Sequence, residues 1–211
     1  MSKPVCLVTA PVATRSGYGA HSRDIVRALI KLDKFDVKIW NVRWGNTPMN
    51  ALSADEPNDK MIIERLLPTP NLSTQPEIHI HIVIPNEFQA FGKYNIGITA
   101  GLETTACPAA WIEGLNRMDM NMVPSTFVKE VVEKTVFDVQ DEKTKQVKGQ
   151  LTSNKPIEVL FEGSDTDIYK QTSEFSPLLI EEMNKVEDPF NFLFVGHWLQ
   201  GNLGKDRKDV G

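Results

Sequence analysis

The sequence predicts an α/β protein of Rossmann-like type, with a parallel sheet and helices on both of its faces. Two observations support this prediction: short apolar runs alternate with segments of helical periodicity, and the first run, Val5–Ala10, is almost continuously apolar. A strand without polar alternation is typical of a sheet that is covered on both faces. Such sheets bind ligands at the carboxyl ends of their strands.

The remaining elements follow in order along the chain. The helix predicted at Ala20–Leu32 carries Ile25 and Leu29 on one face. Further strands are predicted at 35–42, 77–84, 94–100, 120–123, 156–161 and 189–195. Further helices are predicted at 59–66, 108–117, 125–137 and 177–186.

Smaller signals refine these elements. Ser125 is the expected N-cap of its helix. Trp111 is expected to pack in the core together with Ile112 and Leu115 on the same helix. The polar segment 138–155 is interpreted as a surface excursion, with a hairpin turn at 142–145 as one option.

Composition and charge exclude several classes of protein. The chain has 211 residues, a net charge of −5 and no long block of like charge, so nucleic acid is not expected as a partner. Cys6 and Cys107 show no metal or disulfide spacing, and Cys6 is expected to be a buried thiol. No segment matches a membrane span or a signal peptide, which predicts a soluble cytoplasmic protein.

Gly17 and Gly19 lie just before the predicted helix, where backbone N–H groups and the helix dipole favour an anion. With Ser22 they nearly match a dinucleotide fingerprint. Two features oppose a nicotinamide site: the first glycine lies seven residues beyond Ala10, and "WNVRWG" offers no acid for a ribose. A flexible glycine turn remains an alternative interpretation.

Two other groups could bind a metal. Asp165 and Asp167 could hold Mg²⁺ beside a diphosphate, but the pair stands without the rest of a metal triad, which favours a solvated turn. His79 and His81 alternate with isoleucines, so both imidazoles point to one face of their strand. No third ligand is evident, and we expect buried, hydrogen-bonded histidines rather than a metal site.

Four stretches together resemble the retaining glycosyltransferases of family four, which have the two-domain GT-B architecture. They are "GYG" after the first strand, "EIHIHIVIP", "PAAWIEGLNRMDMNMVPSTFVKEV" and "EVLFEGSDTDIYK". The resemblance covers nearly the whole chain. It implies an acceptor-side domain over 1–170, a linker over 171–188 and the start of a nucleotide-sugar-binding domain over 189–211. It also places Asp165 in the turn that closes the first domain.

The resemblance implies donor- and acceptor-binding residues. Gly17, Tyr18 and Gly19 correspond to the family's glycine loop, which lies against the donor phosphates and the acceptor. In "VGHWLQGNLGKDRKDVG", Lys208 matches a lysine that faces the donor diphosphate, with Arg207 beside it. His197 stands where the family has arginine, and an imidazole is a weaker partner for a diphosphate than a guanidinium.

Glu103 is the candidate catalytic residue. It lies in "GLETT" at the end of the strand at 94–100, where many relatives carry a histidine that faces the acceptor hydroxyl. A carboxylate there could accept the proton of that hydroxyl or hold a sugar hydroxyl. The structural alternative is that Glu103 caps the helix at Pro108 or orders its own loop.

The resemblance therefore implies a metal-independent enzyme that transfers a sugar from a nucleotide-sugar co-substrate, with retention, to a hydroxyl of a glycan or small molecule. About half of such an enzyme would lie beyond Gly211, so these 211 residues alone are expected to be inactive. An unpaired strand at 190–195 is expected to promote self-association. Two alternatives stay open: a nicotinamide-dependent oxidoreductase or epimerase, and a non-catalytic Rossmann-like domain that binds a glycan or a partner chain.

Overall fold

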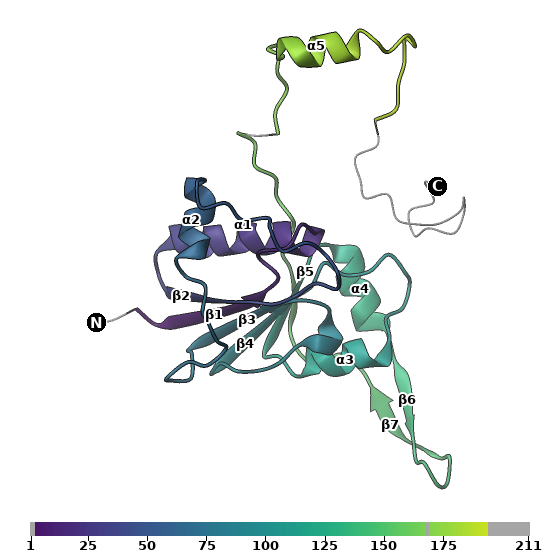
Figure 1. Ribbon diagram of the computed structural model, residues 1–211. Helices are drawn as coiled ribbons and strands as arrows, with labels where there is room; N and C mark the ends of the chain where they lie inside the picture. The colour runs from purple at the N-terminus through teal and green to yellow at the C-terminus, as the bar shows by residue number, and fades with distance from the viewer. Residues whose placement is uncertain (1–2, 168, 194–211) are drawn as a thin grey trace. The chain divides into compact units, whose positions relative to one another are not determined.

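The computed structural model describes residues 3–167 and 169–193 and contains a six-stranded parallel sheet (Figure 1). The strands are β1 (Val5–Ala10), β2 (Asp36–Asn41), β3 (Ile78–Ile82), β4 (Tyr94–Ile98), β5 (Met120–Val123) and β8 (Ile157–Val159). Their order in the sheet is β2-β1-β3-β4-β5-β8, which confirms the predicted Rossmann-like α/β fold. The order reverses direction at β1, which has β2 on one side and β3 on the other.

Helices alternate with these strands along the chain. They are α1 (Gly17–Leu32), α2 (Pro57–Ile63), α3 (Ala109–Asn116) and α4 (Thr126–Lys134), and a short 3₁₀ turn, η1, spans Pro85–Glu87. Helix α5 (Pro177–Met183) follows β8. The N-cap predicted at Ser125 is confirmed, since its hydroxyl accepts the N–H of Val128 at 3.2 Å. Helix α4 ends earlier than predicted, at Lys134, because the chain enters a further strand at Phe137.

The start of α1 differs from the prediction. The helix begins at Gly17 rather than Ala20, because the Ser16 hydroxyl accepts the N–H of Gly19 at 3.0 Å and caps the first turn. The two glycines are therefore part of the helix and do not precede it.

Alternation along the strands gives the sheet two different faces. Cys6, Val8, Ile80 and Ile98 point to the face that α1 covers and belong to one apolar core. The opposite face contacts a second apolar core, built from buried side chains of α3, α4 and their neighbouring loops. The prediction for the α3 side chains is confirmed, since Ile112 and Leu115 are fully buried and Trp111 packs against this core.

A two-stranded antiparallel hairpin projects from this body in Figure 1. It consists of β6 (Phe137–Gln140) and β7 (Val147–Leu151), so the predicted surface hairpin is confirmed. Its turn is organised by Asp141, whose carboxylate accepts the N–H groups of Lys143 and Thr144 at 2.9 and 2.7 Å.

The chain divides into a compact unit that ends at Gly163 and a second unit that begins at Ser164. In the second unit, α5 is capped by Ser176, whose hydroxyl accepts the N–H of Leu179 at 3.2 Å. The strand predicted at 189–195 is wrong over residues 189–193, which form no strand, and residues 194–195 lie outside the described chain. In the described part of this unit no neighbouring strand offers backbone partners, and a lone strand is not stable. Self-association through 190–195 stays a prediction.

Candidate functional site

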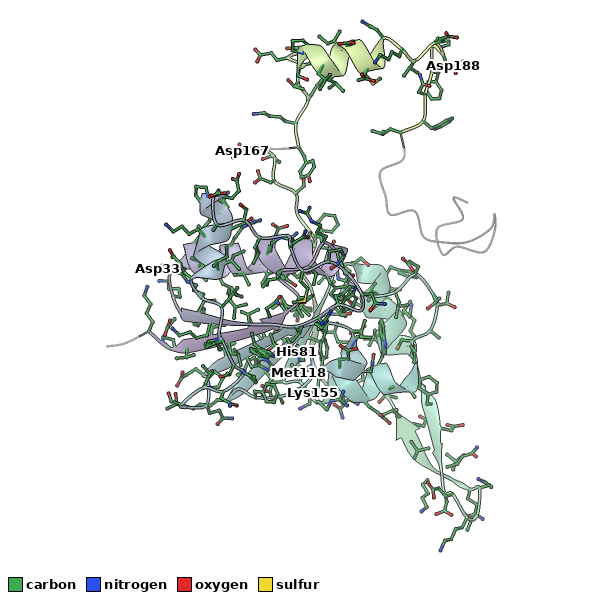
Figure 2. The ribbon with its side chains drawn as sticks, in the orientation of Figure 1. Asp33, His81, Met118, Lys155, Asp167 and Asp188 are labelled. Carbon is green, nitrogen blue, oxygen red and sulfur yellow. The ribbon has the colours of Figure 1, made fainter. Side chains whose placement is uncertain are left out.

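The carboxyl ends of β2, β1 and β3 place three side chains in one row across the sheet. Trp40 pairs in register with Thr9, and Thr9 pairs with His81. All three point away from α1, because their neighbours along each strand are in the α1 core. In Figure 2, His81 lies on the side of the sheet opposite α1. This row marks the point at which the strand order reverses, where open α/β sheets bind ligands.

The histidines of β3 are buried in a polar layer on this face, as predicted. His79 is fully buried, and its Nε2 shares a hydrogen bond with the Thr9 hydroxyl at 2.9 Å. His81 Nδ1 accepts the N–H of Gln89 at 3.1 Å. Burial lowers the pKa of His79 to about 4 and that of His81 to about 3, so both rings are neutral at pH 7.

The segment after β3 closes over this layer. The Phe88 ring occupies the space above Gly97, where an added Cβ would lie 2.4 Å from Phe88 Cε2. Its ring centroid is 5.9 Å from that of His81. Arg117, which follows α3, donates to the Phe88 and Asn86 carbonyl oxygens at 2.9 and 2.8 Å. These contacts fix the backbone that carries Glu87 and Gln89.

A pocket of about 460 Å³ opens at this point, which we call the switch-point pocket. Its floor is formed by Thr9, His81 and Val83, all of them buried. Its wall and rim are formed by Trp40, Val42, Arg43, Pro70, Glu87, Gln89 and Phe91. The volume lies in the range of roughly 300–1,000 Å³ that is typical of small-molecule sites.

Tyr18 joins the start of α1 to the end of β4. Its hydroxyl lies 2.9 Å from Thr99 Oγ1 and accepts the N–H of Ala100 at 3.1 Å. Its ring packs on Trp44, which follows β2, with centroids 4.1 Å apart. Burial raises the pKa of Tyr18, so its hydroxyl stays protonated at neutral pH. The tyrosine thus connects three of the segments that leave the carboxyl edge of the sheet.

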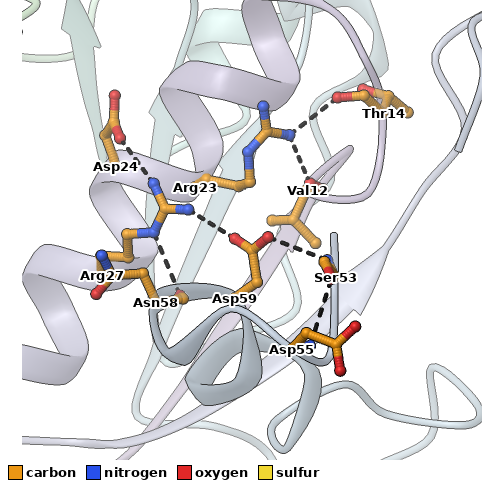
Figure 3. A network of polar contacts seen from close by, with 9 residues as sticks. All are labelled: Val12, Thr14, Arg23, Asp24, Arg27, Ser53, Asp55, Asn58 and Asp59. Atoms are coloured by element: carbon orange, nitrogen blue, oxygen red, sulfur yellow. Dashed lines mark hydrogen bonds and ion pairs between the residues drawn. The ribbon is translucent and has the colours of Figure 1, made fainter. Parts of the chain in front are cut away.

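A polar network holds the loops beside α1 (Figure 3). Arg23 donates to the carbonyl oxygens of Val12 and Thr14 at 2.8 and 2.9 Å, which fixes the loop between β1 and α1. Arg27 pairs with the largely buried Asp59 at 2.8 Å. The other oxygen of Asp59 accepts the N–H of Ser53 at 3.0 Å. The network therefore orders the loop after β2, which supplies Arg43 and Trp44.

Replacing Tyr18 by phenylalanine should destabilise this junction without disturbing the ring that packs on Trp44. The buried Thr99 hydroxyl and the Ala100 N–H each lose their hydrogen bond to the Tyr18 hydroxyl, so we expect a loss of about 1–2 kcal/mol in the free energy of unfolding. Urea unfolding followed by circular dichroism measures it. Tyr94→Phe is the matched control, since Tyr94 is 44% exposed. Equal stability of the two variants would contradict the assigned role of the hydroxyl.

Glu103 is exposed to solvent and lies in the loop that follows β4, at the same edge of the sheet as the start of α1. The loop turns at Gly101, whose φ of +82° favours glycine. The N-cap of α3 is Pro108, which makes no side-chain cap hydrogen bond of its own. That Glu103 caps this helix or orders its own loop stays a structural alternative. The fold therefore brings Gly17, Tyr18, Gly19 and Glu103 to one edge.

The other residues singled out in the sequence lie outside the described chain or belong to the second unit. His197, Arg207 and Lys208 lie outside the described chain. Asp165 accepts the N–H of Asp167 at 3.0 Å in an exposed turn, as the solvated interpretation predicted. Within residues 3–167 and 169–193, no group of three or more histidine, cysteine or acidic side chains could hold a metal ion. No helix in this part is long and apolar enough to span a bilayer.

The rim of the pocket was not predicted from the sequence. Trp40, Arg43, Glu87 and Gln89 belong to no motif, and their convergence depends on the strand order. These residues could have been found by applying the rule that ligands bind where the strand order reverses to the residues at the ends of the first three strands.

Comparison of the chain with protein-family models, curated proteins and solved structures returned no match to any of them.

Proposed function

We propose that the chain is the acceptor-side domain of a glycosyltransferase, which positions an acceptor hydroxyl for sugar transfer from a nucleotide-sugar donor. The observation that supports this proposal is the switch-point pocket, which opens at the carboxyl ends of β1, β2 and β3. The Gly17–Gly19 turn and the Glu103 loop leave the same edge of the sheet but do not line the pocket. A concave site with aromatic walls and a few polar groups suits a small hydroxylated molecule.

The roles of the residues follow from their chemistry. Gly17 and Tyr18, in the first turn of α1, lie where backbone N–H groups favour the phosphates of a donor. Glu103 offers a carboxylate that could hold or deprotonate an acceptor hydroxyl. Donor recognition by His197, Arg207 and Lys208 remains part of the proposal, because these residues lie outside the described chain. Catalysis would rest on positioning the acceptor and stabilising the diphosphate.

The test is release of nucleoside diphosphate by the natural full-length protein. The protein is incubated with uridine-, guanosine- and adenosine-diphosphate sugars, with and without a mixture of mono- and disaccharides. Acceptor-dependent release supports the proposal. Absence of release with every donor, together with stabilisation by NAD in a thermal-shift assay, would replace it with the oxidoreductase alternative. Absence of both would leave the non-catalytic binding domain.

In an active full-length protein, Glu103→Gln should reduce transfer to the acceptor by about 10²–10⁴-fold, the range expected when a positioned general base is removed. Donor binding should change little, since the residue faces the acceptor in this proposal. Glu113→Gln is the matched control, because Glu113 is an exposed glutamate on α3. Equal losses in transfer and in donor binding would assign Glu103 a structural role.

A further inference from the structure

We propose that the switch-point pocket takes an uncharged sugar or cyclic-polyol ring, and that it discriminates against phosphorylated and carboxylated acceptors. This inference rests on the proposed function, because it names the acceptor class of that site. The charges, the aromatic side chains and the floor of the pocket support it.

The aromatic side chains define two apolar surfaces. Trp40 is half-buried at the end of β2, and Phe91 is 46% exposed in the segment after η1. Sugar and inositol rings carry C–H groups that pack on aromatic faces, while their hydroxyls point outward. Two aromatic walls in one cavity therefore suit a ring better than an extended polar chain.

The charges of the pocket are balanced. Arg43 contributes one positive group and Glu87 one negative group, both at the exposed rim. Arginine donates hydrogen bonds and a carboxylate accepts them, so together they suit hydroxyl groups, which do both. A phosphate would contact one cation but would also meet the Glu87 carboxylate, and the described residues of the pocket lining supply no second cation.

The floor adds no positive charge. His81 is 5% exposed, and its Nδ1 already accepts a hydrogen bond from the Gln89 N–H. Its ring stays neutral at pH 7, because burial lowers its pKa to about 3. Thr9 presents a hydroxyl that bonds to His79. The bottom of the pocket is thus polar and uncharged. It offers an anionic ligand no cation to offset the cost of removing its charge from water.

The experiment is a titration of the ¹⁵N-labelled chain, followed by NMR, with methyl α-glucoside, myo-inositol and glucose 6-phosphate at millimolar concentrations. We expect one of the two neutral rings to shift the Trp40 indole N–H and the Glu87 and Gln89 amides. Glucose 6-phosphate should bind at least tenfold more weakly. No binding by either neutral ring, shifts confined to other residues, or tighter binding of the phosphate would overturn the inference.

Variants test the assigned groups. Glu87→Gln should weaken the neutral ring about tenfold, as expected for loss of one charge-assisted hydrogen bond. Glu113→Gln, outside the pocket, should leave its affinity unchanged. Trp40→Phe should keep the fold and retain part of the affinity for the neutral ring. Equal affinities of all variants would contradict the assignment of this site.

Release of nucleoside diphosphate separates the two proposals. Release with phosphorylated acceptors only would support the transferase and overturn the neutral-ring inference. Binding of a neutral ring without release would support the neutral-ring inference and count against the transferase.

Discussion

Replacing Gly114 by alanine is expected to unfold the domain or to lower its free energy of unfolding by about 3 kcal/mol or more. An added Cβ would lie 1.8 Å from the Pro85 carbonyl oxygen, 2.4 Å from its carbonyl carbon and 3.0 Å from Asn86 N. All three are backbone atoms of the η1 turn, so no rotamer change can relieve the clash. Helix α3 and the turn would have to separate, which would expose the buried Ile112 and Leu115 side chains.

The measurement is urea unfolding at 25 °C, followed by far-UV circular dichroism. Glu113→Ala is the matched control on the neighbouring, exposed position of α3, and its effect should stay within about 0.5 kcal/mol. Intrinsic helix propensity alone would make Gly114→Ala stabilising by about 1 kcal/mol. A stabilised Gly114→Ala protein would therefore show that α3 does not pack on η1 as described.

Gly19→Ala is expected to have the second large effect, at the start of α1. Its Cβ would lie 2.3 Å from the Thr14 carbonyl oxygen and 2.6 Å from the Thr14 hydroxyl. The Thr14 side chain is buried and donates to the Pro11 carbonyl oxygen at 2.8 Å, so it cannot move aside easily. We expect a loss of about 2–3 kcal/mol in the free energy of unfolding, the upper part of the range for overpacking.

Gly17→Ala provides the control within the same turn. Apart from the adjacent residues and the backbone of its own helix, no atom lies within 4 Å of the Cβ that would be added there, so this variant should be neutral or stabilised by up to about 1 kcal/mol. Urea unfolding of the two variants measures the contrast. The structure predicts that only Gly19 must be glycine, because it packs closely on Thr14. Equal destabilisation of the two variants would instead mean that both positions need the conformational freedom of glycine.

The body of the fold was predictable because its signals are local. The apolar runs gave β1 and β5 with the observed bounds, since a buried strand shows its period within a few residues. Ser125 was identified as a cap from its position alone. The start of α1 was missed because glycine has a low helix propensity, and the cap from Ser16 and the packing of Gly19 on Thr14 outweigh it.

The pocket could not be predicted because it depends on contacts between distant segments. Trp40, Thr9 and His81 meet only through the register of three strands, and no local pattern encodes that register. The strand predicted at 189–195 failed for a related reason. An apolar run indicates a strand only where another strand can pair with it, and the described part of the second unit offers none.

The position of β1 has a consequence for the synthesis of the protein. Strand β1 is synthesised before β2 and β3 but lies between them in the sheet, and its pairing with β3 joins Cys6 to Ile78, residues separated by 72 positions. Until β3 has been synthesised, one side of the apolar strand β1 has no backbone partner and stays exposed to water and to other chains. Parallel pairing at such separation also closes slowly. The pairing of β1 on its second side therefore waits for the synthesis of residues 78–82.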